Sequence, residues 1–324
     1  MTSLVSELCA EVADLGASMT MTERLWALAR LGILSSVLLG GAWVFFSQPL
    51  GALSLMVVVM AGIAYALLLI ATHEMVHGTF LGRPDLERLL ACALSWPMAW
   101  PQLTYARLHH LHHRWNGRDA RDPERTDVLP HERESAGPWR RWLQDHLLPW
   151  RIVVLGGVGL IADTAAKGWQ LTDVDPALAR SRWLDGVGVI AVHGLMLSLA
   201  ITHNVVWRYL LFWLVLERVI GAIVQFRGLV EHHGLWHSES SHLLTQLYGS
   251  RNVTVPIWLN AFFGGLPHHS AHHAFPWIPS SRLPQATARV AAVLEHHRAP
   301  ELPTLNSYRE AATLLSRLVA KQAR

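Results

Sequence analysis

The longest stretch of this chain without a charged side chain runs from Leu31 to Thr72. It is interrupted only by a short polar and turn-forming segment at residues 47–51. A helix that crosses a lipid bilayer needs about 20 apolar residues, and a helix satisfies its own backbone hydrogen bonds, as lipid requires. We therefore predict two membrane-spanning helices joined by a tight turn.

Two further apolar segments, Gly186–Val206 and Tyr209–Phe226, predict a third and a fourth span. The segments Leu89–Trp100 and Ile152–Ala162 are apolar but too short to cross, so we expect them at the membrane interface or in the membrane plane. Only 16% of the residues are charged and 51% are hydrophobic, whereas soluble domains carry about 25% charged residues. The sequence therefore predicts an all-α membrane protein with about four transmembrane helices.

The loop between the second and third predicted spans is rich in arginine, which places it on the cytoplasmic side by the positive-inside rule. Its arginines are Arg107, Arg114, Arg118, Arg121, Arg125, Arg133, Arg140 and Arg141. An even number of spans then puts both termini on that same side. We expect a multi-pass integral membrane protein whose termini and active site are cytoplasmic.

The chain shows no internal repeat and no low-complexity linker, so residues 1–324 are predicted to form a single domain. Its core is expected at about residues 31–284, followed by a cytoplasmic amphipathic tail at residues 285–324. The net charge of +3 is small and no nucleic-acid motif is present, so no nucleic-acid partner is expected. Apolar residues at helical spacing also predict a short surface helix near the N-terminus, lying on the protein or on lipid: Leu4, Leu8, Val12 and Leu15.

Histidines gather in three clusters: HEMVH at residues 73–77, HHLHH at residues 109–113 and HHSAHH at residues 268–273. On a helix, residues three and four apart share a face, so each cluster could point several imidazoles in one direction. Neutral imidazole is the commonest metal ligand and suits iron, zinc, copper or nickel. Eight histidines at these spacings exceed what one ion coordinates, which favours two metals sharing one pocket.

These clusters resemble the histidine boxes HxxxH, HxxHH and HxxHH of the membrane-bound fatty acid desaturase and hydroxylase superfamily. The third cluster continues as HHAFPWIPSSRLP, which is similar to the family's HHxFPxxPxxxLP. The stretch RLHHLHHRWNGRDARDPE likewise resembles the family's second box followed by a DP dipeptide. The resemblance covers roughly residues 55–284. It implies a cytoplasmic helical cap that holds two iron ions in a non-haem di-iron centre, with O2 as co-substrate.

Carried over residue by residue, the resemblance implies nine metal ligands. They are His73, His77, His109, His112, His113, His232, His269, His272 and His273. His232 is chosen for the histidine that the family places after the fourth span. Residues that could support the ligands without binding metal are Glu74, His110, Glu231, His233 and His268.

Other charged residues near the clusters receive plainer interpretations. Asp119 and Asp122 follow the second cluster and could either support its histidines or shape the loop, and shaping the loop is the favoured interpretation. Four histidines lie outside any motif and are predicted to be surface residues: His237, His242, His296 and His297.

The resemblance implies a fatty acid desaturase, which introduces a double bond into an acyl chain of a lipid or related substrate. A hydroxylase, ketolase or decarboxylase of the same superfamily, acting on a carotenoid, alkane or fatty acid, is the alternative, because the same histidines would serve either reaction. One position departs from the family: Gly228 stands where some members have an asparagine that holds a metal-bound water. Electrons are expected from an external donor such as a ferredoxin, since the chain has no rubredoxin cysteine set and no recognisable haem domain.

A non-enzymatic metal transporter or a haem-binding membrane protein is a third interpretation, from a different class. Transport would place polar ligands along the spans at membrane depth, whereas these clusters flank the spans. Ionisable residues do lie inside the last two predicted spans, among them His193, Glu217 and Arg218. His193 and Glu217 lie about equally far from the turn between these spans. We hypothesise that they meet at one depth and form a hydrogen bond.

Overall fold

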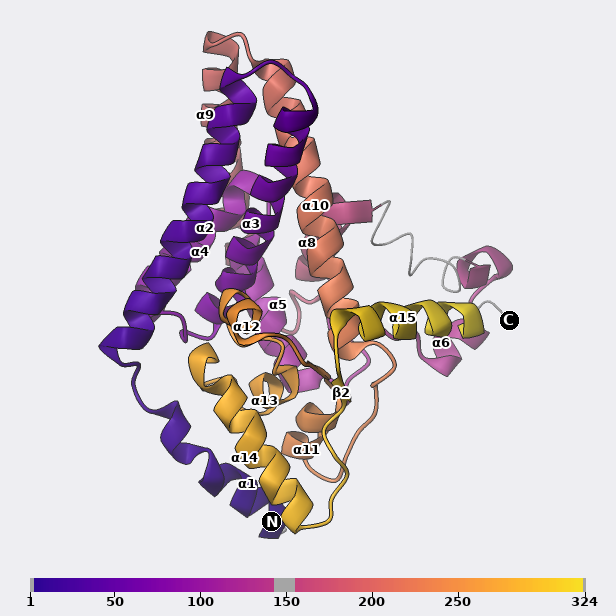
Figure 1. The fold of residues 1–324 in the computed structure, drawn as a ribbon. Coiled ribbons are helices and arrows are strands. Elements are labelled where there is room, and N and C mark those ends of the chain that lie inside the picture. The colour runs from indigo at the N-terminus through magenta and orange to yellow at the C-terminus, as the bar shows by residue number, and fades with distance from the viewer. Residues whose placement is uncertain (1–2, 143–154, 323–324) are drawn as a thin grey trace. The chain divides into compact units, whose positions relative to one another are not determined.

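The computed structural model describes residues 3–142 and 155–322. Within these residues four helices are long and apolar enough to cross a membrane (Figure 1): α2 (Met21–Ser47), α3 (Ala52–Val76), α9 (Ala177–Thr202) and α10 (Val206–His232). The structure is helical with almost no strands, so the prediction of an all-α membrane protein with about four spanning helices is confirmed.

The remaining elements are short. In chain order they are α1 (Ser3–Glu11), η1 (Ala13–Gly16), α4 (Pro84–Ser95), η2 (Trp96–Met98), α5 (Gln102–Trp115), α6 (Pro130–Glu134), α8 (Gly156–Gln170), α11 (His242–Tyr248), β1 (Asn252–Val253), α12 (Ile257–Phe262), α13 (His269–Ala274), η4 (Ser280–Arg282), α14 (Leu283–His296), β2 (Thr304–Leu305) and α15 (Tyr308–Gln322). The strands β1 and β2 pair in parallel, with Asn252 opposite Thr304.

The helices extend beyond the apolar segments that predicted them. Helix α2 begins at Met21 rather than near Leu31, and α9 begins at Ala177 rather than near Gly186. A run of apolar residues predicts only the part of a helix that lies in lipid. The first turns of α2 and α9 are more polar, so hydrophobicity alone does not predict them. The short segment Leu89–Trp100 forms parts of α4 and η2. The segment Ile152–Ala162 lies partly in α8 and partly outside the described residues.

The chain divides into two compact units. Unit 1 comprises residues 1–20, 110–151 and 226–324, and unit 2 comprises residues 21–109 and 152–225. The boundaries fall inside α5 and inside α10, so each of these helices contributes residues to both units. Each unit is described by itself below.

In unit 2, α2 and α3 form an antiparallel hairpin, and α4 packs against α3. Beneath the end of α3, a small apolar core surrounds Met75 and Phe80. Helices α8 and α10 approach closely at Gly221, where a Cβ atom would collide with the backbone of Gly157. No residue larger than glycine fits at that crossing without a shift of one helix.

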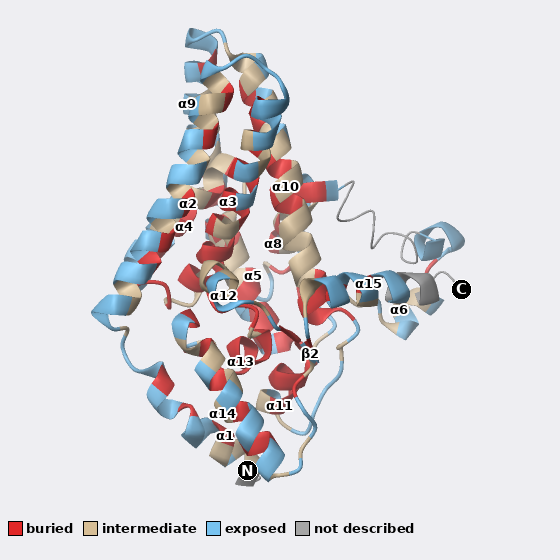
Figure 2. Ribbon diagram, in the orientation of Figure 1, coloured by how far each residue is buried: buried red, intermediate tan, exposed pale blue. Residues whose placement is uncertain are grey.

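The surface of unit 2 is unusually apolar. In Figure 2, α9 is coloured mostly as exposed or intermediate. Only 11% of the residues in its apolar 18-residue stretch are buried, against 50% for the corresponding stretch of α3. Its exposed side chains include Ile190, which is 74% exposed, and Leu195, which is 62% exposed. Contiguous exposed apolar surface of this kind is typical of lipid contact.

A buried carboxylate in unit 2 fixes the start of α5. Asp185 of α9 is 2% exposed and accepts hydrogen bonds from the backbone N–H groups of Leu103 and Thr104 at 3.0 and 2.8 Å. It also accepts from the Thr104 hydroxyl at 2.8 Å and from the Trp96 indole N–H at 3.0 Å. The first N–H groups of a helix have no partner inside it, so Asp185 caps α5 from a distant helix.

Replacing Asp185 with alanine should therefore destabilise unit 2. Buried donors left without their charged acceptor cost about 1–3 kcal/mol, so we expect a clear fall in the melting temperature of the purified protein in detergent. The exposed Asp173 of the same unit is the control, and Asp173→Ala should leave the melting temperature nearly unchanged. Equal melting temperatures for the two variants would show that Asp185 does not hold α5.

The hypothesis that His193 and Glu217 form a hydrogen bond is wrong. The Nδ1 atom of His193 lies 2.8 Å from the Tyr209 hydroxyl. Glu217 instead accepts a hydrogen bond from the backbone N–H of Val158 at 2.6 Å and pairs with Arg218. Distance from the connecting turn predicts depth along a helix, but it does not predict which way the side chain points around the helix axis.

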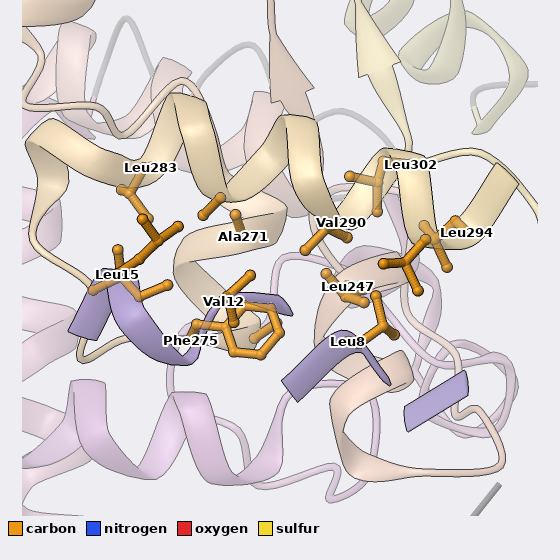
Figure 3. Packing of buried hydrophobic residues seen from close by; sticks show 14 of the residues in the cluster. Leu8, Val12, Leu15, Leu247, Ala271, Phe275, Leu283, Val290, Leu294 and Leu302 are labelled. Atoms are coloured by element: carbon orange, nitrogen blue, oxygen red, sulfur yellow. The ribbon is translucent and has the colours of Figure 1, made fainter. Parts of the chain in front are cut away.

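Unit 1 is built around an apolar core that joins α1, α11, α13 and α14 (Figure 3). Leu8, Val12 and Leu15 of the N-terminal segment are almost fully buried in it, together with Phe275. The predicted N-terminal helix is therefore present, and its apolar face lies on protein. An ion pair between Arg289 and Asp14 adds a polar contact between the same segment and α14.

The predicted amphipathic tail forms two helices, α14 and α15, rather than one. Between them lie Pro300 and Pro303 and the short strand β2. Proline lacks a backbone N–H and clashes with the preceding turn, so a helix does not continue through this segment. The apolar side of α14 forms part of the unit 1 core, with Val290 fully buried.

Candidate metal centre

Unit 2 contains a cluster of three imidazoles, called here the α3–α5 cluster. His73 lies in the last turn of α3, His77 caps that helix, and His109 comes from α5. The Nε2 atoms of His77 and His109 are 3.1 Å apart, and the rings of His73 and His109 have centroids 4.4 Å apart. Each residue offers a nitrogen within 4.8 Å of the others. The i, i+4 spacing of HEMVH thus brings two imidazoles to one end of α3.

Glu74, between the two histidines of α3, forms a buried ion pair with Arg30 of α2. Arg30 and Glu74 are 3% and 4% exposed, so this pair joins the α2–α3 hairpin away from solvent. Tyr105 stacks on the ring of His109, with centroids 5.4 Å apart. These neighbours restrict the position of the cluster within unit 2.

Unit 1 contains a larger cluster of six imidazoles, called here the α13 cluster. Its members are His112, His113, His232, His269, His272 and His273. Residues three and four apart lie on the same side of a helix, so α13 has one side that carries histidines and one side that carries alanines. His269, His272 and His273 form one face, while Ala271 and Ala274 belong to the apolar core on the other.

The nitrogen atoms of the α13 cluster converge closely. The Nε2 atom of His269 lies 3.0 Å from Nε2 of His232 and 3.1 Å from Nε2 of His273. The ring centroid of His112 lies 4.8 Å from that of His232 and 4.9 Å from that of His273. His113 stacks on His273 at 4.3 Å. All of these rings are buried.

The outer partners of three rings fix their tautomers. His232 Nδ1 lies 3.2 Å from the carbonyl oxygen of Gly249, and His112 Nδ1 lies 2.8 Å from a carboxylate oxygen of Asp122. Carbonyl and carboxylate oxygens only accept hydrogen bonds, so each Nδ1 must carry the hydrogen. In a neutral ring Nε2 then has the lone pair, as a metal ligand requires.

The tautomer of His273 is fixed in the same way, through two successive hydrogen bonds. Its Nδ1 lies 3.0 Å from Oε1 of Gln246, and Nε2 of Gln246 donates to the carbonyl oxygen of Asn116 at 3.2 Å. The second contact identifies Oε1 as the acceptor, so His273 Nδ1 donates to it. His112, His232 and His273 therefore all direct Nε2 towards a common point, with donor atoms within 4.8 Å of one another.

Electrostatics in the cluster suit a bound cation. Burial and the neighbouring imidazoles hold the pKa values of His269 and His273 well below the ordinary range, so these rings are neutral. Burial also lowers the pKa of His112, but the Asp122 and Glu124 carboxylates outweigh it and raise that pKa to about 9, so a metal ion binding at Nε2 of His112 would displace a proton. Buried neutral imidazoles beside negative charge are a donor set that fits a divalent metal such as iron or zinc.

Of the residues predicted to support the ligands, His110, His233 and His268 belong to neither cluster. His233 is ion-paired with Asp127 at 3.0 Å, while its neighbour His232 lies in the α13 cluster. His110 is exposed, and His268 lies 3.1 Å from the Thr287 hydroxyl. The four histidines expected at the surface are exposed or half-buried: His237, His242, His296 and His297.

A sequence profile of the family described as "Fatty acid desaturase" matches residues 47–304, most of the chain. The chain belongs to the fatty acid desaturase family. An acyl-lipid (9-3)-desaturase of Physcomitrium patens is 27% identical over 93 residues, which is 28% of this chain and 18% of that protein. The chain thus covers less than a fifth of the length of this relative, and it shares the family's oxidoreductase class and membrane helices.

Two residues behind the ring of His273, Gln246 and Asn116, were not predicted from the sequence, and the contact of Asp122 with His112 was the less favoured of two interpretations. Asp122 was expected mainly to shape its loop, but its buried carboxylate contacts His112 with both oxygens, at 2.8 and 3.0 Å. The position of Asp122 in the DP dipeptide after the second histidine cluster was the sequence feature that could have indicated this contact. Neither Gln246 nor Asn116 is part of a motif, and only the fold brings Gln246 to His273 and Asn116 to Gln246. Gly117, which follows α5 with φ of 72°, allows close approach to the His237 carbonyl, where a Cβ would collide.

Asp122→Ala should weaken metal binding, because loss of such a supporting carboxylate typically costs about 10–100-fold in metal affinity. Asp119, which pairs with Arg121 at the surface, supplies the matched control Asp119→Ala. Competition between the protein and a chelator of known affinity measures the difference. The role assigned to Asp122 would be wrong if both variants kept metal as tightly as the wild type.

Proposed function

We propose that this chain is a fatty acid desaturase that introduces a double bond into an acyl chain, using O2 at a non-haem di-iron centre. The observation that carries the proposal is the α13 cluster, in which three outer partners orient buried imidazoles inward, in a chain of this family. The α3–α5 cluster of unit 2 supplies a second set of converging imidazoles.

The proposed ligands are the nine histidines of the two clusters. They are His73, His77 and His109 from unit 2, and His112, His113, His232, His269, His272 and His273 from unit 1. When bound, the irons would supply the oxidising power for cleaving unactivated C–H bonds, which no protein side chain provides. The histidine-rich donor set, without cysteine, is compatible with iron.

The protein's own residues would hold the ligands and keep water away. Asp122, Gln246 and the Gly249 carbonyl orient three rings, and the core behind α13 fixes that helix. We propose that apolar residues of α3 and of the part of α10 that belongs to unit 2 bind the acyl chain. A dry site of this kind protects a reactive oxidant from water.

The proposed reaction converts a –CH2–CH2– unit into –CH=CH– and reduces O2 to two molecules of water. Two electrons come from the C–H bonds, and two more electrons with two protons must be supplied. We propose an external electron donor such as a ferredoxin, a lipid-linked or otherwise carried acyl substrate, and a cytoplasmic site, in keeping with the arginine-rich segment after α4.

Product analysis tests the proposed reaction. Cells that express the chain are supplied with acyl lipids, and their fatty acids are examined by mass spectrometry, with a His73→Ala/His269→Ala variant as the inactive control. We expect a product that has lost two hydrogens and that is absent with the variant. A product that has gained one oxygen would instead assign the chain to the hydroxylases of the superfamily.

A further inference from the structure

A carboxylate lies among the imidazoles of the α13 cluster. Glu231 of α10 directly precedes His232 and is 3% exposed. Its Oε2 atom lies 3.4 Å from Nε2 of His269, and Glu231, His232 and His269 together offer three ligand atoms within 4.8 Å of one another. Glu231 thus reaches the same point as two histidines proposed to bind iron.

The spacing of these atoms matches that of ligands on one ion. Two ligands bound at about 2.1 Å, with angles of roughly 90° to 109° between them, lie about 3.0–3.4 Å apart. The observed distances from His269 Nε2 are 3.0 Å to His232, 3.1 Å to His273 and 3.4 Å to Glu231. The last distance is long for an N–H···O hydrogen bond, which is usually about 2.7–3.2 Å.

The other oxygen of Glu231 is held in place. Nε of Arg227, one turn earlier on α10, donates to Oε1 at 2.6 Å. The backbone N–H of Arg251 donates to the Glu231 carbonyl at 2.8 Å, and the Arg251 guanidinium donates to the carbonyl of Val230 at 2.6 Å. These contacts fix the end of α10 and leave Oε2 directed towards the imidazoles.

We propose that Glu231 is an oxygen ligand of the metal held by His232, His269 and His273, so that this part of the centre is a mixed nitrogen–oxygen site. The inference rests on the proposed function and specifies the donor set of its metal centre. A carboxylate oxygen is a ligand that iron accepts beside imidazole. It also places a negative charge against the cation, inside a site from which water is excluded.

Two substitutions test this ligand. Glu231→Gln removes the charge and weakens the donor, while Glu231→Asp keeps the negative charge near Arg227 but shortens the side chain by one methylene. The matched control is Asp127→Asn, because Asp127 is a part-buried carboxylate of the same unit that pairs with His233. Proteins loaded with 57Fe are compared by iron content and by Mössbauer spectroscopy.

We expect both Glu231 variants to retain one iron at least tenfold more weakly and to change the spectrum of that iron, while Asp127→Asn matches the wild type. If the Glu231 variants keep both irons with an unchanged spectrum, Glu231 is not a ligand. A wild-type chain that binds iron but makes no desaturated product refutes the proposed reaction and leaves the ligand assignment standing. A wild-type chain that binds no metal overturns both proposals.

If the variants do not fold, a measurement on the wild-type protein tests whether a glutamate binds the metal. The protein is labelled with 13C at the glutamate carboxyl groups, and its infrared difference spectrum is recorded between the zinc-loaded and metal-free forms. A label-sensitive shift of a carboxylate stretch on zinc loading supports coordination by a glutamate. A difference spectrum without any label-sensitive band overturns the proposal.

Discussion

Replacing His112 with alanine is expected to abolish formation of the desaturated product and to remove about one iron per chain. Loss of a ligand should exceed the roughly 10–100-fold effect of losing a supporting residue. His112 is 1% exposed and belongs to a group of three converging imidazoles, with His232 and His273. Its removal therefore leaves a buried gap in the donor set that water and the remaining rings do not fill with the same geometry.

The control for this prediction is His237→Ala. His237 is exposed, and its ring contacts Leu235 and Glu239, both close in sequence. The variant should keep the iron content and the product yield of the wild type. Product yield in cells and iron in the purified proteins are measured for both variants. If the two variants behaved alike, the assignment of His112 as a ligand would be untenable.

Replacing Phe275 with alanine is expected to cause the largest loss of stability in unit 1. Phe275 is fully buried directly after α13 and packs with Leu8, Val12 and Leu247 (Figure 3). Truncation of a buried phenylalanine costs about 3–5 kcal/mol, through lost apolar burial and the cavity left behind. Since the same core anchors α13, iron retention should fall together with the melting temperature in detergent.

Trp258→Ala serves as the comparison for Phe275→Ala. Trp258 is also an aromatic residue of unit 1, but it is 63% exposed. Substitutions at such surface positions usually change stability by less than about 0.5 kcal/mol. A melting temperature for Phe275→Ala as high as that for Trp258→Ala would mean that the core beneath α13 does not support the cluster.

Much of the fold could be predicted because lipid imposes simple rules. Residues 31–72 lack charge and are broken once, which predicts the hairpin of α2 and α3. The helix ends were harder to predict, since the polar turns of α2 before Leu31 lie beyond the apolar signal. The division of the tail into α14 and α15 could have been anticipated from Pro300 and Pro303, which no helix accommodates easily.

The imidazole clusters could be anticipated because they depend on local spacing. The spacing of HEMVH and HHSAHH places histidines three and four residues apart, and helices α3 and α13 turn that spacing into shared faces. The residues that orient His273 could not be predicted, because Gln246 meets His273, and Asn116 meets Gln246, only through folding over long sequence separations. His193 and Glu217 show the same limit, because the rotation of α9 and α10 about their axes depends on packing that the sequence pattern does not encode.

The iron content of the purified wild-type chain is the direct test of the proposed di-iron centre. The chain is reconstituted with ferrous iron in detergent under anaerobic conditions, passed through a desalting column, and assayed for metal and protein. The structure and the family together predict about two irons per chain, lost when the histidines of either cluster are replaced. A fully folded chain with intact histidines that retained no iron would contradict the account.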